Sequence, residues 1–247
     1  MRFKNIFIVT FMLLVCIGTP LCRDQQTKHE WDLEKIEEYK QSVTIITTLF
    51  QDNASTGAGV VIRPDGLTLT AAHLFRHGDI QRVIMQTTNG NYYEMVILAY
   101  DNTRDLALIR PTAASPTFKY AQIQTENTVD INSDIIVIGH PLLQWFYMVE
   151  KGVILAVEFD LTYMGEIEKI SALIRPGNSG GPVISTDGKV IGIVSAVMID
   201  IFTRHAYYGI AISIKEINKF LEKSLANERY WPKQIKRYRM GDIVEAN

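Results

Sequence analysis

Residues 176–183 of the chain read Pro176-Gly177-Asn178-Ser179-Gly180-Gly181-Pro182-Val183. Glycines on both sides of a serine allow a tight backbone turn and let another group come close to the backbone amides. A serine hydroxyl is a weak nucleophile alone, so it needs a neighbouring base and donors for the oxyanion that forms on attack. Expected β-strands flank the stretch on both sides, which excludes the G-x-S-x-G turn between a strand and a helix. A purely structural glycine-rich turn is the alternative.

Short segments rich in Val, Ile and Thr recur about every ten residues, which is typical of an all-β sandwich or barrel. The expected strands are 43–50, 57–62, 67–72, 83–86, 92–100, 106–110, 135–139, 153–159, 168–173, 183–184, 190–196 and 207–212. No regular alternation of strands and helices is visible. A division near residue 123 separates the strands into two halves of similar size.

Two further segments have the residue types that a serine nucleophile needs. His73 directly follows the expected strand, and Ala71 and Ala72 leave space beside it. The other four histidines lie in polar or turn contexts: His29, His77, His140 and His205. Asp105 leads into an apolar strand, where a partly buried carboxylate can orient an imidazole. An ordinary aspartate at the start of a strand is the alternative, and Asp101 is the nearby competitor.

Helices are expected only near the two ends. Residues 214–225 have apolar side chains at i, i+3 and i+4 spacing, which predicts an amphipathic helix. A shorter charged helix is expected within 28–41, with an apolar stripe of Trp31, Leu33, Ile36 and Tyr39. Residues 226–247 are polar and basic, and they predict a solvated tail or a surface strap. Docking to a membrane or a partner is the alternative for this tail.

The N-terminus has the pattern of an export signal. Arg2 and Lys4 precede an apolar run that ends before Gly18, so residues 1–22 predict a signal peptide or a short N-terminal anchor. Residues 23–41 then form the N-terminal helical segment. We expect an exported protein, periplasmic or secreted, that contacts a membrane only if the first segment stays uncleaved. Both cysteines, Cys16 and Cys22, fall in this segment, so the mature domain has no internal disulfide.

Composition narrows the function classes. A net charge of -2 gives no general attraction to nucleic acid, and 47% hydrophobic residues exclude wholesale disorder. No glycine-rich nucleotide motif and no Cys/His pair with metal-ligand spacing is present in the sequence. We therefore expect no metal, no other cofactor and no nucleic-acid partner.

The three segments around His73, Asp105 and Ser179, in that order, resemble the trypsin-like serine proteases, most closely the HtrA (Deg) branch. Residues 56–62, 192–195 and 209–212 are similar to further strands of that branch. The similarity extends from about residue 42 to 225. It implies two six-stranded antiparallel β-barrels, about 42–123 and 124–213, followed by a C-terminal α-helix at 214–225.

The resemblance also assigns roles. Ser179 would attack the scissile carbonyl, His73 would transfer the proton, and Asp105 would orient the imidazole. The backbone N–H groups of Gly177 and Ser179 would form the oxyanion hole. Ser195 would lie near the buried Asp105 and begin the segment that pairs with substrate backbone. These roles imply a serine endopeptidase acting on unfolded or extended polypeptide without a cofactor.

The expected substrate-binding residues are Ile174, Ser195, Ala196, Val197 and Tyr208, with Leu173 as a further wall residue. None of them is charged, so we expect a small or medium apolar side chain at the cleaved residue. Arg175 is close by and is expected to be exposed.

Several features depart from the family pattern. Asn178, not Asp, precedes the serine, and the Ile-Val-Gly-Gly start of activated zymogens is missing. The stretch after the last helix is too short for a PDZ domain, so we expect none, and the oligomeric state stays open. The alternatives to an endopeptidase are a catalytically silent double-barrel module with a binding or chaperone-like role, and a serine hydrolase acting on esters.

Overall fold

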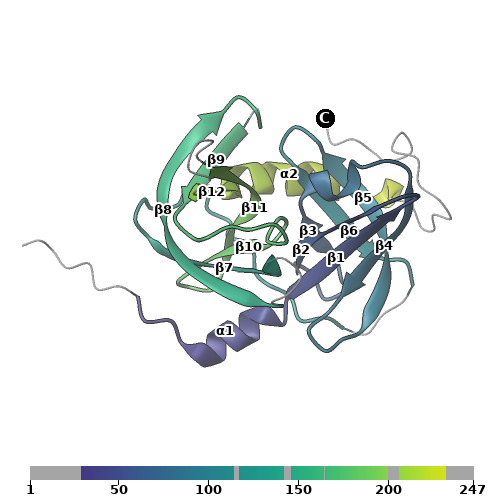
Figure 1. The fold of residues 1–247 in the computed structure, drawn as a ribbon, viewed down its shortest axis with the longest axis horizontal. Helices are drawn as coiled ribbons and strands as arrows, with labels where there is room; N and C mark the ends of the chain where they lie inside the picture. The colour runs from purple at the N-terminus through teal and green to yellow at the C-terminus, as the bar shows by residue number, and fades with distance from the viewer. Residues whose placement is uncertain (1–28, 114–116, 142–145, 164, 200–205, 232–247) are drawn as a thin grey trace, which may run out of the picture.

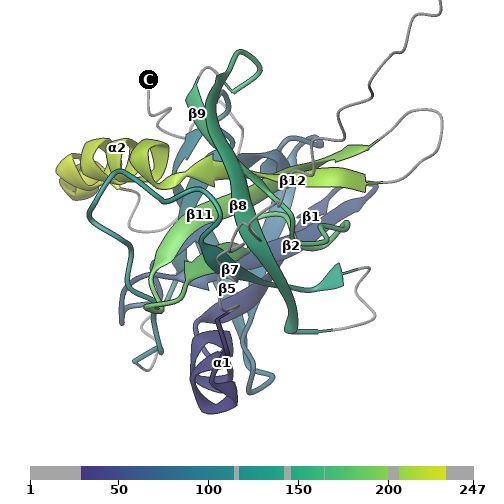
Figure 2. The ribbon, with the colours of Figure 1, turned by 90° about the vertical axis from the view of Figure 1, so that its left-hand side faces the viewer.

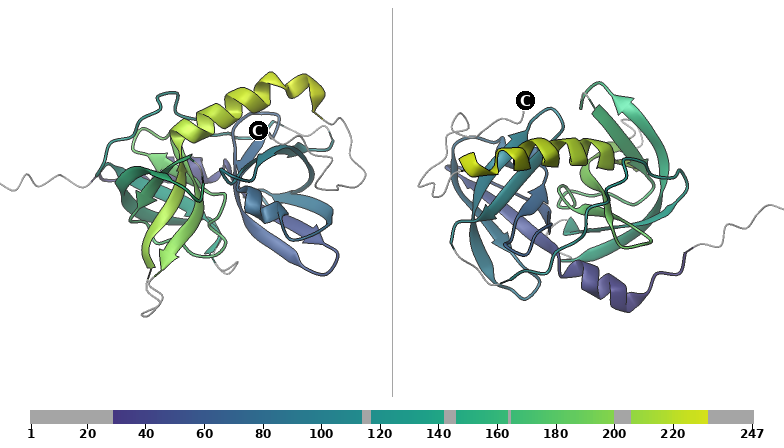
Figure 3. Two further views of the ribbon diagram at one scale, coloured as in Figure 1. Left: turned by 90° about the horizontal axis from the view of Figure 1, so that it is seen from above. Right: turned by 180° about the vertical axis from the view of Figure 1, so that it is seen from behind.

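The computed structural model describes residues 29–113, 117–141, 146–163, 165–199 and 206–231. In these residues, twelve strands close into two barrels of six antiparallel strands each. The barrels stand side by side, and helix α2 (Ile214–Ala226) lies across the back of both (Figures 1 and 3). The predicted fold class is confirmed. The expected segment 1–22 lies outside the described residues.

The first barrel is ordered β1-β2-β3-β6-β5-β4 and closes by pairing of β1 with β4. Its strands are β1 (Val43–Phe50), β2 (Ala54–Val61), β3 (Thr68–Thr70), β4 (Ile80–Gln86), β5 (Tyr92–Asp101) and β6 (Leu106–Pro111). Alternate residues of each strand point inward, and the interior is filled by branched side chains such as Ile46, Val60 and Leu108.

The second barrel is ordered β10-β11-β12-β9-β8-β7. Its strands are β7 (Asp134–Gly139), β8 (Met148–Asp160), β9 (Gly165–Ile170), β10 (Pro182–Ser185), β11 (Val190–Ile199) and β12 (Ala206–Ser213). The predicted start of β8 at residue 153 was wrong by five residues. Glu150 and Lys151 obscure the apolar pattern there, yet both pair with β7 through backbone groups that need no apolar side chain.

The expected strand 67–72 is shorter than predicted, because it ends at Thr70. Residues Ala72–Phe75 form a single 3-10 turn instead. The N–H of Ala72 donates to the main-chain oxygen of Asp105 at 3.1 Å, and the N–H of His73 donates to its Oδ1 at 2.7 Å. Asp105 therefore accepts hydrogen bonds from the backbone N–H groups of Ala72 and His73, which would otherwise pair with a neighbouring strand.

Helix α1 (Leu33–Lys40) begins later than the expected segment 28–41. The Asp32 side chain accepts from the N–H of Glu34 at 2.9 Å and caps the helix there. Trp31 and Ile36 are buried against the outside of the second barrel (Figures 1 and 2). Leu33 was expected in the same apolar stripe, but at the first position of the helix it is 74% exposed.

Helix α2 joins the two barrels. Ile217 and Phe220 belong to one hydrophobic cluster with the interior of the first barrel. Arg104, in the β5–β6 turn, donates to Oε2 of the buried Glu216 at 2.8 Å and to Oδ2 of Asp101 at 2.8 Å. Burial raises the pKa of Glu216, but hydrogen bonds from Lys219 and Arg104 outweigh it, so the pKa is lowered overall. The carboxylate is therefore charged at neutral pH and ties α2 to the first barrel.

The predicted polar tail begins as a strap on the first barrel. The 3-10 helix η3 (Glu228–Tyr230) leads to Trp231, which is buried in the cluster of the first barrel. The Arg110 guanidinium lies 5.9 Å from the centroid of the Trp231 ring, and Arg63 pairs with Glu228 at 3.2 Å. Residues 232–247 lie outside the described part of the chain.

Among the described residues, no helix has the length and apolar character needed to cross a membrane.

Replacing Glu216 by Gln removes a charged acceptor that two cations share. We expect the free energy of unfolding at neutral pH to fall by ~2 kcal/mol, because hydrogen bonds to charged groups are lost from a buried site. The folded-state pKa of Glu216 is lowered, so its contribution is present above the ordinary value of 4.5 and is lost as the pH falls through the lower folded value. Urea unfolding at neutral and acidic pH measures both effects.

The matched control is Glu222→Gln on the exposed face of the same helix, for which we expect no measurable change. Equal stabilities of the two variants would contradict the role of Glu216.

Candidate active site

Asp105 holds both the backbone and the ring of His73. Its Oδ2 lies 2.8 Å from His73 Nδ1, and its Oδ1 accepts from the His73 N–H at 2.7 Å. The side chain is buried, and its backbone φ is 58°, in the left-handed region that Asp tolerates better than most residues. This conformation turns the carboxylate back from the start of β6 toward the 3-10 turn that carries the histidine.

The nearby Asp101 has a different role. Its carboxylate accepts from the N–H groups of Thr103 and Arg104 at 2.9 and 2.8 Å, so it closes the β5–β6 turn. The structure therefore places Asp105, and not its competitor, on His73.

Arg76 is a residue that sequence reasoning missed. Its Nη2 lies 3.4 Å from Asp105 Oδ1, and Asn102 holds the guanidinium through Nε at 2.8 Å. Nothing in the local sequence signals this contact, because only the barrel brings residues 76 and 105 together.

A β-bulge in β11 aims Ser195 at the same carboxylate. Val194 pairs with Ala211 and Ala196 pairs with Ile210, so Ser195 is the extra residue between two register positions. Its Oγ lies 2.5 Å from Asp105 Oδ2 and 3.2 Å from the hydroxyl of Tyr163. The second barrel thus contributes a donor to an acid of the first.

The Ser179 loop is anchored to both barrels. The Ser179 main-chain oxygen accepts from the N–H of Ala58 in β2 at 2.8 Å, and the Gly180 N–H donates to the oxygen of Val194 in β11 at 2.8 Å. A Cβ at Gly180 would lie 2.2 Å from the Ala58 oxygen, and one at Gly57 would lie 2.6 Å from the Ser179 oxygen. Both glycines are therefore required by close approach of backbone to backbone.

Within the described residues, the Ser179 hydroxyl makes one hydrogen bond, to the main-chain oxygen of Ser195 at 3.3 Å. It makes none to the His73 ring, whose Nε2 has no partner in the same part of the chain. The Ser179 hydroxyl and the His73 imidazole are therefore not hydrogen-bonded to each other in this structure.

The turn before the serine presents two free amides. Gly177 is buried, and its φ of 100° is a backbone conformation that only glycine readily adopts. Neither its N–H nor that of Ser179 has an acceptor among the described residues. A buried N–H without a partner is rare, and one of its explanations is an anion that binds there during a reaction.

His140 supports this turn from β7. Its N–H donates to the Gly177 oxygen at 3.3 Å, its Nε2 lies 3.1 Å from the Thr44 oxygen, and its Nδ1 accepts from the Tyr147 N–H at 3.1 Å. His140 was expected in a turn before Pro141, and its ring is fully buried between the barrels. Burial lowers its pKa from 6.5 to about 4, although the hydrogen bond to Thr44 acts in the opposite direction. The ring is therefore neutral near pH 7.

The expected substrate-binding residues fall on two faces. Ile174 belongs to the interior cluster of the second barrel, and the partly buried Val197 packs against that cluster; a Cβ at Gly209 would lie 2.4 Å from Ile174. Ala196 and Tyr208 pack against the other cluster, toward the first barrel. Alternation along β11 and β12 separates the two pairs, so the five residues do not line one common wall.

The charged residues near this region differ from expectation. Lys169 lies 4.8 Å from the Tyr208 ring, and Arg175 is paired with Glu150 at 2.8 Å. Glu168 is fully buried in the second barrel, and burial raises its pKa well above the ordinary value. Its Oε1 accepts from the N–H of Ile214 at 3.4 Å, at the start of α2. Burial therefore disfavours the charged form of this acid, the form that would pair with a cationic substrate side chain.

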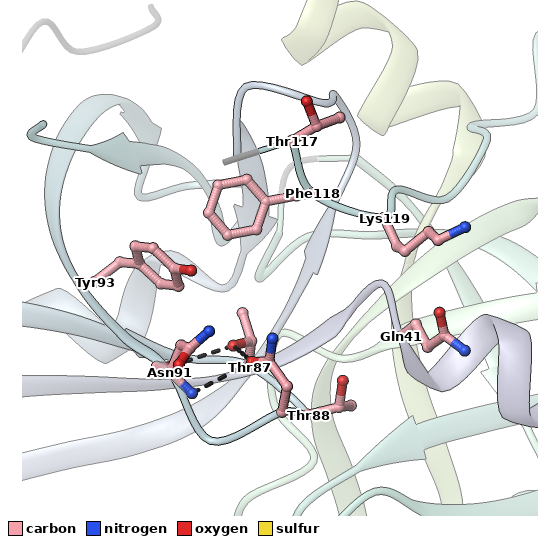
Figure 4. Close-up of a pocket in the computed structure, with 9 residues that line it drawn as sticks. Gln41, Thr87, Thr88, Asn91, Tyr93, Thr117, Phe118 and Lys119 are labelled. Carbon is pink, nitrogen blue, oxygen red and sulfur yellow. Dashed lines mark hydrogen bonds between the residues drawn. The ribbon is translucent and has the colours of Figure 1, made fainter. Parts of the chain in front are cut away.

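A polar hollow of about 480 Å³ opens at the other end of the first barrel (Figure 4). Thr87 and Asn91 of the β4–β5 hairpin line it together with Tyr93, Phe118 and Lys119. It contains none of the residues described above, so it is separate from the His73 site. Among the described residues, no group of three or more His, Cys, Asp or Glu side chains is arranged to hold a metal ion.

Comparison with known proteins agrees with this geometry. A family model for a trypsin-like peptidase domain matches residues 57–193. An HtrA-like serine protease of Staphylococcus aureus is 30% identical over 167 residues, which cover 61% of this chain and 22% of that protein. The chain thus spans about a fifth of the length of the curated relatives that it matches.

Solved structures show the same fold. The serine endoprotease from Yersinia pestis superposes with a TM-score of 0.68 at 22% identity, over 81% of this chain and 69% of that one. The HtrA-type protease AlgW with a tripeptide gives 0.69 at 21% identity, over 79% and 63%.

Two glycines with similar backbone conformations test the anchoring of the serine loop. Gly180 and Gly90 have φ values of 84° and 81°, but nothing lies within 4 Å of a Cβ at Gly90. Both Ala variants incur left-handed strain of ~1 kcal/mol. Gly180→Ala must also displace backbone, so we expect it to lower the free energy of unfolding by ~2 kcal/mol more. Equal losses in urea unfolding would contradict the anchoring.

The buried His140 predicts a pH dependence. Its pKa is 6.5 in the unfolded chain and about 4 in the folded one, so protons favour the unfolded state. Its stabilisation is full above pH 6.5 and is lost as the pH falls to 4, by up to about 3 kcal/mol. A His140→Gln variant should show a flatter stability profile over that range in urea unfolding. Parallel profiles would contradict a buried neutral ring.

Proposed function

The chain belongs to the trypsin-like peptidase family, and from this premise we propose that it is a serine endopeptidase that works through Ser179, His73 and Asp105. One observation carries the proposal. The buried Asp105 carboxylate accepts from His73 Nδ1 at 2.8 Å and from Ser195 Oγ at 2.5 Å, so it orients the imidazole with Nδ1 toward the acid and Nε2 away from it. Nε2 has no partner among the described residues and is the ring nitrogen that can take a proton from a nucleophile.

The reaction follows from these positions. Ser179 Oγ rotates away from the Ser195 oxygen and attacks the scissile carbonyl carbon, while its proton passes to His73 Nε2. The imidazolium, stabilised by Asp105, then gives the proton to the leaving amine as the peptide C–N bond breaks. An acyl-enzyme ester on Ser179 remains. Water attacks it with His73 again as base, and release of the carboxylic acid restores the serine.

The oxyanion hole is assigned to the N–H groups of Gly177 and Ser179. Their lack of an acceptor among the described residues supports this role, as does the His140 contact that fixes the Gly177 carbonyl. Donors placed before the reaction need no reorganisation when negative charge develops on the carbonyl oxygen.

The substrate is proposed to be unfolded or extended polypeptide, because a serine nucleophile must reach a backbone carbonyl, which an extended chain exposes. We propose an apolar residue on the acyl side of the cleaved bond, since the expected pocket residues Ile174 and Val197 are apolar and burial disfavours the charged form of Glu168. The sequence pattern of residues 1–22 supports export, to the periplasm or outside the cell.

A catalytically silent binding module is the second candidate. One observation favours it: the Ser179 hydroxyl bonds to Ser195 and not to His73. Ester hydrolysis would use the same side chains, and it differs from peptidase action only in the bond of the substrate that is cleaved.

Casein cleavage by the full chain tests the proposal. We expect the wild type to hydrolyse casein, and Ser179→Ala to lose at least ~1000-fold in rate, because nucleophile and base act as a unit. His73→Ala should lose a similar amount. A folded wild type that turns over simple esters but leaves casein intact would favour the ester hydrolase, and one inert to both would favour the binding module.

Substrate preference needs its own measurement. In a panel of chromogenic peptides that differ only at the cleaved residue, we expect Val, Ala and Leu to exceed Lys and Arg in kcat/KM by at least ~10-fold. A preference for Arg or Lys would refute the apolar site.

A further inference from the structure

Tyr163 lies in the turn between β8 and β9, which stands near the top of Figure 1. The Asp160 carboxylate accepts from the N–H groups of Thr162 and Tyr163 at 2.7 and 3.4 Å, and this fixes the turn. The tyrosine ring is half-buried and packs against the hydrophobic cluster that both barrels share. Its hydroxyl ends 3.2 Å from Ser195 Oγ.

The direction of that hydrogen bond follows from counting protons. Ser195 Oγ carries one hydrogen and lies between the Asp105 carboxylate at 2.5 Å and the Tyr163 hydroxyl at 3.2 Å. A carboxylate only accepts, so the serine hydrogen points to Asp105. The Tyr163 hydroxyl must then donate to a lone pair of Ser195 Oγ.

The tyrosine keeps its proton under the conditions in which a peptidase works. Burial raises the pKa of Tyr163, and the nearby Asp105 carboxylate acts in the same direction, while the Ser195 hydrogen bond opposes both. The hydroxyl is therefore a permanent donor at neutral and mildly alkaline pH.

We infer that Tyr163 is a positioning residue whose hydroxyl holds Ser195 Oγ, and through it the Asp105 carboxylate, in the orientation that aligns His73. The inference rests on the proposed function. The Tyr163 hydroxyl donates to Ser195 Oγ, and Ser195 Oγ donates to Asp105 Oδ2. The same Oδ2 atom is hydrogen-bonded to His73 Nδ1.

Ser195 makes a second contact in the site, because its main-chain oxygen accepts a hydrogen bond from the Ser179 hydroxyl at 3.3 Å. One residue thus contacts the catalytic acid through its side chain and the nucleophile through its backbone. Within the described residues, Tyr163 itself makes no hydrogen bond to Ser179 or to His73. Its loss should therefore lower the rate of the chemical step and leave substrate binding unchanged.

The test is Tyr163→Phe in the full chain, which removes one hydroxyl and keeps the ring. With a peptide p-nitroanilide substrate, we expect kcat to fall about fivefold, the equivalent of one hydrogen bond, with KM within about twofold of wild type. Tyr93→Phe is the matched control, because its ring packs on Phe118 far from Ser195, and it should keep full kcat.

A double-mutant cycle separates positioning from general packing. In a Ser195→Ala background the tyrosine has lost its acceptor, so Tyr163→Phe should change kcat by less than about 1.5-fold. Wild-type kcat in Tyr163→Phe, or the same loss in both backgrounds, would overturn the inference while the active wild type upholds the proposed function. A wild type without peptidase activity would instead overturn the proposed function itself.

Discussion

The Asp105 carboxylate lies where the two barrels meet, and the arrangement of the site depends on how it is satisfied. A buried charge of this kind is costly unless donors surround it. Here the His73 N–H, the His73 ring and the Ser195 hydroxyl supply three hydrogen bonds, and Arg76 adds a cation at 3.4 Å. Two of these donors come from the 3-10 turn of the first barrel and one from the second barrel. Satisfying the charge therefore fixes the barrels against each other.

The glycine-rich loop around Ser179 also connects the two barrels, but here the acceptor comes from the second barrel and the donor from the first. Ser179 belongs to the second barrel, yet its main-chain oxygen takes the N–H of Ala58 from the first. His140 adds a second crossing, because its ring reaches the Thr44 oxygen while its backbone holds Gly177. Helix α2 is tied to the first barrel at the back of the molecule by the ion pair between Arg104 and Glu216. The amides of Gly177 and Ser179, which find no acceptor in the part of the chain that the structure describes, are thus held by contacts that neither barrel makes alone.

Sequence patterns predicted the strands well, because most of them are short runs rich in Val, Ile and Thr bounded by turn residues. His73, Asp105 and Ser179 were found as candidates because strand ends and glycines surround them in the sequence. Arg76, Tyr163 and His140 were missed, since each acts through a partner at least 29 residues away or through backbone groups. The bulge at Ser195 was also invisible, because β-bulges follow from register and not from composition. Alternation along β11 and β12, and not the bulge, puts the expected substrate-binding residues on two faces.

Fluorophosphonate labelling followed by peptide mapping measures whether Ser179 is activated, since the probe reacts only with a serine that a base activates. We expect one adduct, on Ser179, in the wild type, and none in a folded His73→Ala variant. A folded wild type that stays unlabelled, or that labels equally without His73, would contradict the claim that the two barrels assemble a working nucleophile.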